Sequence, residues 1–188
     1  YELNGVEYLV VDEEMLRYMA VDWRNNDLSK VVTTKVTDMK GLFYYGTYNT
    51  FINSWTDTFS GLVLSDEYIM YQDIEVDHFS EFNQDLSSWD VSNVTNFFVT
   101  FMGCNAFNSE IGKWNVSNAT YMRSMFNMAY DFNQDISNWD TSMVNSMTRM
   151  FRGATSFNSE IGGWDVSKVE SMFGMFERHG GGEESYPT

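Results

Sequence analysis

The sequence predicts an α/β repeat solenoid with a period of about 25 residues, which lies within the range typical of such folds. Two observations carry that prediction. Phe82, Phe107, Phe132 and Phe157 are evenly spaced along the chain. Each opens the same phrase, written FNQDLSSWD, FNSEIGKWN, FNQDISNWD and FNSEIGGWD. In solenoids, stacked neighbours supply the core that no single unit can build alone.

Each unit is expected to hold a short parallel strand and a short helical turn. In the third phrase, Phe132 and Ile136 should point inward and Asp135 outward, which fits a strand of about three residues. The second half starts with a Ser, which we expect to cap a short helix because apolar residues follow at spacings of three, four and seven. These serines are Ser92, Ser117, Ser142 and Ser167.

The packing of one unit can be predicted residue by residue. The apolar residues of the third unit should be buried, while three of its polar residues should be exposed. The expected core comprises Phe132, Ile136, Trp139, Val144, Met147, Met150 and Phe151. The expected exposed residues are Asn138, Asn145 and Arg149.

Residues 1–27 are predicted to form an N-terminal strand and a capping helix. Alternating apolar residues favour a strand in residues 1–11, and Asp12 is a plausible N-cap for a helix that extends to Trp23. Solenoids need an atypical terminal unit to cover the open core. This helix is the natural candidate.

Residues 28–81 are predicted to hold degenerate repeats with an insertion. The phrase VTDMKGLF, residues 36–43, has the spacing of VNSMTRMF, residues 144–151. The separation of Val36 from Val94 exceeds two periods, which suggests an imperfect repeat at 51–60 and an inserted loop at 62–78. Four regular repeats follow at 82–179, and residues 180–188 form a Gly-rich tail.

The phrase FNQDISNWDTSMVNSMTRMF, residues 132–151, with its W-D-V/T-S and M-x-x-M-F elements, resembles the repeat of the BspA-like surface proteins. This family is leucine-rich-repeat-like (LRR-like). The resemblance implies a right-handed solenoid used for surface attachment and protein contact. It implies no catalytic residues.

The composition of the chain limits the classes of partner that it can bind. The net charge of −16 with only 11 Lys and Arg argues against nucleic acid or an anionic membrane as partner and favours cations or basic partners. No apolar run is long enough to span a bilayer. The chain starts at Tyr1 without a signal-like segment, which favours a processed or excised piece.

Enzymatic activity is not expected. The two histidines, His78 and His179, lie in no nucleophile, zinc or phosphate-binding motif. Cys104 is the single cysteine, so no internal disulfide can form. We therefore expect a non-enzymatic protein without a resident cofactor.

Three sets of repeated polar residues are candidate sites. Stacked units would bring four carboxylates into one row, and either solvent screening or a divalent cation such as Ca²⁺ could offset their repulsion. That row is Asp85, Glu110, Asp135 and Glu160. A second row, which we expect to satisfy internal backbone groups, is Asn83, Asn108, Asn133 and Asn158. The glycosylation sequons are at Asn93, Asn115 and Asn118, although such motifs also arise by chance.

The ends of the predicted solenoid suggest self-association. The last unit has no amphipathic cap, so apolar side chains should line an open core face, and an unpaired N-terminal strand of another copy could cover it. The expected contact residues are Leu3, Val6, Tyr8, Val10, Trp164, Phe173 and Phe176.

Two functions follow. The first is an extracellular or cell-surface structural protein that contacts other proteins or assembles end to end into a filament. The alternative is an adhesin-like module that binds host or neighbour-cell proteins or glycans through its lateral face.

Overall fold

The computed structural model describes residues 2–3, 6–44 and 79–178. Its named elements all lie before residue 33. They are β1 (Glu2–Leu3), β2 (Val6–Glu7), β3 (Leu9–Val10), α1 (Glu13–Val21), the 3-10 helix η1 (Leu28–Lys30) and β4 (Val31–Val32). β1 pairs antiparallel with β2, and β3 pairs parallel with β4.

The predicted N-terminal helix is confirmed. Asp12 is the N-cap of α1, and its side chain accepts the backbone N–H of Met15 at 2.9 Å. Leu16 and Ala20 form the buried face of this helix. The predicted N-terminal strand is divided into three short strands, each of which is already paired.

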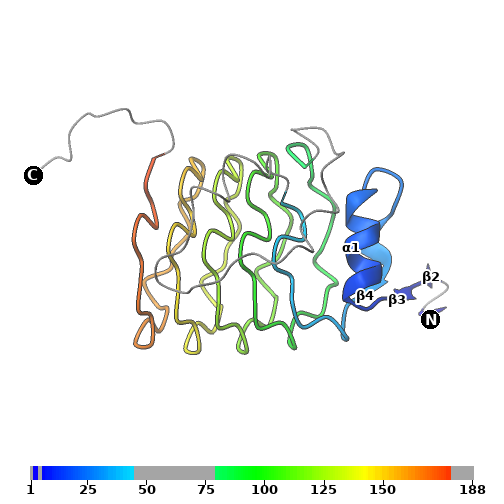
Figure 1. Ribbon diagram of the computed structural model, residues 1–188, viewed down its shortest axis with the longest axis horizontal. Coiled ribbons are helices and arrows are strands. Elements are labelled where there is room, and N and C mark those ends of the chain that lie inside the picture. Colours follow the sequence, from blue (N-terminus) through cyan, green and yellow to red (C-terminus); the bar gives the residue numbers. More distant parts are fainter. Residues whose placement is uncertain (1, 4–5, 45–78, 179–188) are drawn as a thin grey trace, which may run out of the picture.

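The rest of the described chain forms five units that lie side by side, with α1 at one end and the last unit at the other (Figure 1). We number them unit 1 (residues 28–44), unit 2 (82–106), unit 3 (107–131), unit 4 (132–156) and unit 5 (157–178). We refer to their row as the stack. Backbone hydrogen bonds join each unit to the next.

Unit 1 lies directly against unit 2. The N–H of Met39 donates to the carbonyl of Asn96 at 2.9 Å, and the N–H of Thr95 donates to the carbonyl of Thr37 at 2.9 Å. These bonds leave no place for another unit between them. The imperfect repeat predicted at 51–60, the loop at 62–78 and the Gly-rich tail at 180–188 lie outside the described residues.

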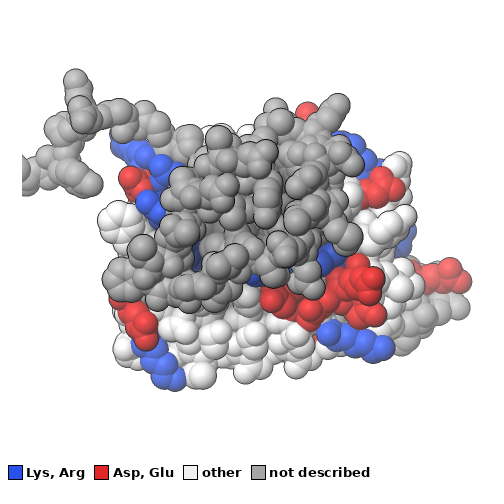
Figure 2. Space-filling model, in the orientation of Figure 1, with Lys and Arg blue, Asp and Glu red and all other residues white. Residues whose placement is uncertain are grey.

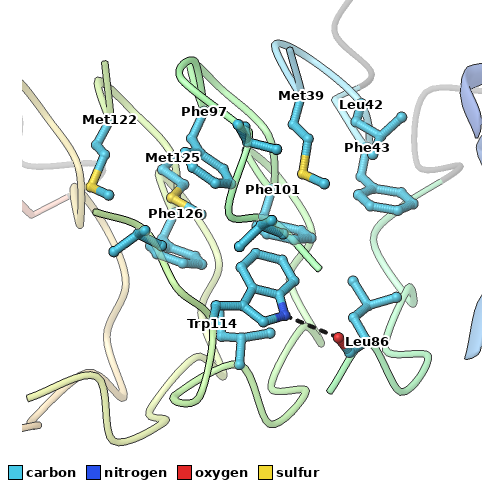
Figure 3. Packing of buried hydrophobic residues seen from close by; sticks show 14 of the residues in the cluster. Met39, Leu42, Phe43, Leu86, Phe97, Phe101, Trp114, Met122, Met125 and Phe126 are labelled. Carbon is cyan, nitrogen blue, oxygen red and sulfur yellow. Dashed lines mark hydrogen bonds between the residues drawn. The ribbon is translucent and has the colours of Figure 1, made fainter. Parts of the chain in front are cut away.

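Two columns of phenylalanine rings run through the core of the stack. Figure 3 shows Phe43, Phe101 and Phe126 of the first column. Rings from consecutive units stack closely, with centroids 3.9 Å apart for Phe101 and Phe107 and again for Phe126 and Phe132. Offset aromatic stacking adds to the stabilisation that burial provides. The core is therefore continuous from unit to unit.

The tryptophan indoles hydrogen-bond each unit to the one before it. The indole N–H of Trp114 donates to the carbonyl of Leu86 at 3.0 Å (Figure 3), and that of Trp139 donates to Ile111 at 3.2 Å. Buried indoles need such an acceptor. Trp89 and Trp164 make the same bond with Leu28 and Ile136.

The parallel pairing between units does not lie where the sequence places it. Single-residue parallel bridges occur in the second half of each unit, not at residues 135–137, where the strand is predicted. They join Asp38, Asn96, Tyr121, Ser146 and Ser171 in order. The predicted short helix is likewise absent from the described part of units 2–5, which contains turns in its place.

Side-chain and backbone geometry explain this difference. Asp140 accepts the backbone N–H of Ser142 at 3.0 Å, so the Asp begins a turn and the Ser is not a helix cap. Further along the same unit, Arg149 has a φ of 55°. A right-handed helix cannot contain that conformation. The spacing of three and four residues therefore comes from successive turns.

The predicted core of unit 4 is confirmed, because all seven apolar residues are buried. Asn138 is exposed as predicted, but Asn145 and Arg149 are half-buried. The guanidinium of Arg149 lies 5.2 Å from the centre of the Phe173 ring, which covers part of its side chain.

Candidate functional site

The two edges of each unit have opposite hydrogen-bonding character. Toward the next unit, alternate backbone N–H groups donate: Phe97 to Tyr121 at 2.8 Å, and in the following unit Met122 to Ser146 at 3.1 Å. In the reverse direction fewer backbone N–H groups donate, as from Thr120 to Thr95 at 2.8 Å and from Asp131 to Asn105 at 2.9 Å. Each unit thus presents a donor-rich edge toward the C-terminal end of the stack and an acceptor-rich edge toward the N-terminal end.

At the N-terminal end, α1 covers the acceptor-rich edge of unit 1. Arg17 donates to the carbonyls of Lys40 at 2.7 Å and Asp38 at 3.2 Å. Those carbonyls correspond to the ones that later units offer to the unit before them. The guanidinium therefore takes the place of a preceding unit.

Glu13, one helical turn before Arg17, completes this cap. Its carboxylate accepts the backbone N–H of Thr37 at 2.9 Å and that of Asp38 at 3.1 Å, and also the Thr37 hydroxyl. Partial burial acts to raise the pKa of Glu13, but these hydrogen bonds outweigh burial and hold the pKa below its ordinary value.

At the C-terminal end, the corresponding edge of unit 5 is open among the described residues. The N–H groups of Met172, Gly174 and Phe176 stand where units 2–4 donate to the next unit. They have no hydrogen-bond acceptor in the part of the chain that the structure describes. An unpaired edge of this kind is a template for pairing with another chain.

Gly162 leaves room at the same edge. In unit 3 the equivalent Gly112 lies under the backbone of unit 4, where an added Cβ would overlap the Asp135 carbonyl oxygen. At Gly162 a Cβ would meet nothing within 4 Å. Neither glycine has a positive φ. Close approach of a neighbouring backbone therefore explains the glycine at 112, whereas no described residue makes such an approach at 162.

Large exposed apolar side chains gather at the two ends of the stack. At the N-terminal end they are Val6, Leu9, Val10, Met15 and Tyr18. At the C-terminal end they are Val166, Met172, Phe173 and Phe176. Within the described residues, Met143 of unit 4 is the only other one. Figure 2 shows a band of uncharged residues along the lower part of the described flank, with acidic and basic residues near both of its ends.

Only some of the predicted end-contact residues are exposed at the ends of the stack. Phe173 and Phe176 are 67% and 59% exposed, which fits an open face. Trp164 is nearly buried, because its ring stacks on Trp139 at 6.4 Å.

At the other end, Val6 and Val10 are exposed, Tyr8 is half-buried and Leu3 lies in β1. The prediction of an unpaired N-terminal strand is wrong, because β1 pairs with β2 and β3 pairs with β4.

The four carboxylates of the acidic row are exposed. Asp85 accepts the N–H of Ser87 at 2.9 Å, and Asp135 accepts that of Ser137 at 3.0 Å. These hydrogen bonds lower the pKa of both aspartates. Glu110 and Glu160 alternate with them. Among the described residues, no group of three or more acidic, His or Cys side chains is arranged to hold a metal ion.

The asparagine row satisfies backbone N–H groups, as predicted, and these bonds also join one unit to the next. The Asn83 side-chain oxygen accepts the N–H of Asn108 at 2.9 Å, and the bond recurs from Asn133 to Asn108 and from Asn158 to Asn133. The row is not internal, because its members are exposed or half-buried.

The three sequon asparagines are exposed, and their side chains bond to the backbone. Asn93 donates to the carbonyl of Thr34 at 2.9 Å, and Asn118 donates to that of Ser92 at 2.7 Å. The side chain of Asn115 accepts the N–H of Ser117 at 3.2 Å. These contacts give all three asparagines a structural role.

Sequence reasoning missed Glu13, Arg17 and Gly162. The first two are spaced four residues apart in the predicted helix, which places them on one face. The repeat phrases also distinguish Gly162. Phrases that contain Gln-Asp have Ser at the equivalent position, whereas phrases that contain Ser-Glu have Gly there. Both signals could have been read without a structure.

These features define a stack of repeats that α1 caps at its N-terminal end and whose last unit has open backbone donors among the described residues. The family model described as "Mycoplasma protein of unknown function, DUF285" matches residues 13–75 and 68–185. The chain therefore belongs to this family. No curated protein and no solved structure that was compared with it matches. Within the described residues, no helix is long and apolar enough to cross a membrane.

Proposed function

We propose that this chain is a non-enzymatic structural protein of the extracellular space or cell surface, in which an LRR-like α/β solenoid joins other copies end to end. The observation that carries the proposal is the concentration of large exposed apolar side chains at the two ends of the stack. Exposed apolar patches of this kind mark contact sites with other proteins. The BspA-like resemblance supports the surface location.

The difference between the two ends favours a head-to-tail contact. Arg17 and Glu13 satisfy the backbone of unit 1, whereas the donor groups of unit 5 are open among the described residues. Two C-terminal ends would bring two donor-rich edges together. Because the two contacting surfaces then differ, each added copy exposes a fresh end, and growth continues unless rotation closes a ring.

The adhesin-like alternative would use the lateral face of the stack, with Ca²⁺ on the acidic row as its possible cofactor. Met143 is the one large apolar side chain exposed away from the ends in the described residues. Fewer large apolar side chains are therefore exposed on the described flank than at either end.

Size-exclusion chromatography with light scattering tests the proposal. The wild-type chain should show a mass that exceeds that of one chain and rises with concentration. Phe173→Ser with Phe176→Ser should shift association to at least tenfold higher concentration, because both rings are exposed. Met143→Ser is the matched control and should leave association unchanged. A wild-type chain that remains monomeric at all concentrations, or an equal effect of Met143→Ser, would contradict the proposal.

A further inference from the structure

The regular units of the stack alternate between two types. Units 2 and 4 open with FNQDLSSW and FNQDISNW, and we call them Gln-Asp units. Units 3 and 5 open with FNSEIGKW and FNSEIGGW, and we call them Ser-Glu units. Because each unit of a solenoid contacts only its neighbours, this alternation produces two kinds of junction between consecutive units.

The junction that follows a Ser-Glu unit lies between units 3 and 4. The side-chain amide of Gln134 donates to the carbonyl oxygen of Asn108 at 2.7 Å and to the side-chain oxygen of the same residue at 2.9 Å. The carbonyl of Asp135 lies so close to Gly112 that it leaves no room for a Cβ atom. A Gln-Asp unit therefore packs on a Ser-Glu unit through the Gln amide and a close approach of its backbone.

The junction that follows a Gln-Asp unit is different. The backbone N–H of Leu86 donates to the hydroxyl of Ser109 at 2.9 Å, and the hydroxyl of Ser159 donates to the carbonyl of Gln134 at 2.7 Å. Serine stands in place of the glycine in units 2 and 4, so these junctions accommodate a Cβ atom. The residues at each junction therefore depend on the type of unit that comes next.

The junction between units 1 and 2 belongs to the N-terminal cap and differs from both. The Gln84 amide donates there to the carbonyls of Trp23 at 2.6 Å and Asn26 at 2.9 Å, and Ser29 stands at the position of the glycine. The reference for the edge of unit 5 is therefore unit 3, the other Ser-Glu unit.

The C-terminal edge of unit 5 matches that of unit 3. Asn158 and Gly162 stand where unit 3 has Asn108 and Gly112, and both are exposed. The carbonyl and side-chain oxygens of Asn158 accept no hydrogen bond from the described residues. An added Cβ at Gly162 would meet nothing within 4 Å. Both features fit an incoming Gln-Asp unit.

Two further features of this edge indicate a complete repeat. The carbonyl of Ile161 has no indole donor among the described residues, whereas that of Ile111 accepts the indole N–H of Trp139. Three alternate backbone N–H groups are also open there, those of Met172, Gly174 and Phe176. Unit 4 supplies every matching group to unit 3 from residues 134–150: the Gln134 amide, the Asp135 carbonyl, the Trp139 indole and the carbonyls of Ser146, Thr148 and Met150. One repeat therefore spans the whole edge.

The N-terminal end of a second copy does not offer these groups. Arg17 binds the carbonyls of Asp38 and Lys40, which correspond to those that later units offer to the unit before them. Val31 stands where the other units have their tryptophan, and β4 is paired with β3. The repeat that fits this edge must therefore come from a partner chain with an uncovered Gln-Asp unit.

We propose that the C-terminal edge of unit 5 is a binding surface for a Gln-Asp repeat of a partner chain, which adds to the stack as a sixth unit. Its carbonyls bond to the open donors, its Gln bonds to Asn158 and its backbone passes over Gly162. The main-chain bonds provide affinity, and the Gln and the glycine clearance select the Gln-Asp type over the Ser-Glu type. This inference goes beyond the proposed function, because the partner is a repeat of another chain and not a second copy.

Peptide binding to the full chain tests which type of repeat the edge accepts. The probe is a fluorescein-labelled peptide with the sequence of residues 132–156, and the matched control has the sequence of residues 107–131, a Ser-Glu unit of the same length. Fluorescence anisotropy should give a dissociation constant about tenfold lower for the probe, because the control lacks the Gln that bonds to Asn158. Equal affinities, or no binding of the probe at any concentration of the chain, would overturn the proposal.

Two adjacent glycines test where the repeat binds. Gly162→Ala puts a methyl group where the Asp carbonyl of the bound repeat would lie, whereas Gly163→Ala is the control, because the equivalent Lys113 and Asn138 already carry side chains. Both changes enter open space in the free chain, so neither should lower the melting temperature. Gly162→Ala should weaken binding of the probe about tenfold, and Gly163→Ala should leave it unchanged. Equal effects of the two variants would overturn the proposal.

Hydrogen exchange locates the bound repeat on the edge. The amide protons of Met172, Gly174 and Phe176 should exchange more slowly when the probe is saturating, and unchanged exchange would overturn the proposal. The same measurements separate this inference from the end-to-end function. If the chain binds the probe but does not self-associate, the edge is a docking surface and the proposed function is wrong. If the chain self-associates without binding the probe, the proposed function stands and this inference is wrong.

Discussion

The carboxylate of Glu13 accepts the backbone N–H of Thr37 at 2.9 Å, at the position where later units donate to the carbonyl of the unit before them. A helix side chain thus substitutes for the main chain of a missing unit. Arg17 supplies the complementary donors one turn later. The cap reproduces the hydrogen bonding of the repeat without its backbone.

Acid should remove the contribution of Glu13 to stability. Its folded pKa lies below its ordinary value of 4.5, so the contribution is complete above about pH 4.5 and is lost as pH falls through the folded pKa. Glu13→Gln should lower the free energy of unfolding at pH 7 by about 1 kcal/mol. Denaturant titrations from pH 7 to pH 2 should show the gap between wild type and variant closing. A gap that is independent of pH would contradict an ionic cap.

Arg17→Gln should destabilise the chain, because its guanidinium bonds to two carbonyls of unit 1. We expect a loss of about 1–3 kcal/mol, measured by denaturant unfolding. Lys35→Gln, an exposed change in unit 1, is the matched control and should change stability by less than about 0.5 kcal/mol. Equal effects of the two variants would show that Arg17 does not cap unit 1.

The two equivalent glycines should respond in opposite ways to alanine. Gly112→Ala places a methyl group on the Asp135 carbonyl oxygen, so units 3 and 4 must separate, at a cost of about 1–3 kcal/mol. Gly162→Ala enters open space and should be neutral or stabilising by about 0.4–1 kcal/mol through the unfolded state. Thermal melts of the dilute monomer provide the comparison. A similar loss in both variants would mean that something already covers Gly162.

Trp139→Ala should cost about 3–5 kcal/mol, because a buried large aromatic ring is removed and the Ile111 carbonyl loses its indole donor. Trp139→Phe should recover most of the packing and leave only the loss of the hydrogen bond. Chemical denaturation measures both variants. A loss below about 1 kcal/mol for the alanine variant would be incompatible with this core.

Calcium binding at the acidic row has a direct test. If Asp85, Glu110, Asp135 and Glu160 hold Ca²⁺, millimolar calcium should raise the melting temperature, and Asp135→Asn should reduce the rise. Because all four carboxylates are exposed, we expect no rise. A rise that Asp135→Asn reduces would establish the metal site.

The sequence predicted the repeat and its packing because these depend on local patterns. The period placed Phe132, Trp139 and Met147 in the core, and the cap at Asp12 located the start of α1. The first pattern repeats along the chain and the second lies within one helical turn, so both can be recognised from the sequence alone.

The position of the inter-unit pairing was harder to predict. The apolar spacing after Ser142 is the spacing of a helix. However, Arg149 and the equivalent Val99 and Ser124 have positive φ angles, which are uncommon for residues other than glycine and are not predicted from their identity. The open edge of unit 5 could not be predicted either. Its donors become visible only when the hydrogen-bond direction between units is known.

Sedimentation velocity over a wide range of protein concentrations tests the end-to-end account most directly. Contact between two different ends has no built-in stop, so the weight-average sedimentation coefficient should keep rising with concentration beyond that of a dimer. The Phe173→Ser and Phe176→Ser double variant should remain at the monomer value over the same range. A single monomeric species at every concentration, or a plateau at the dimer, would contradict the account.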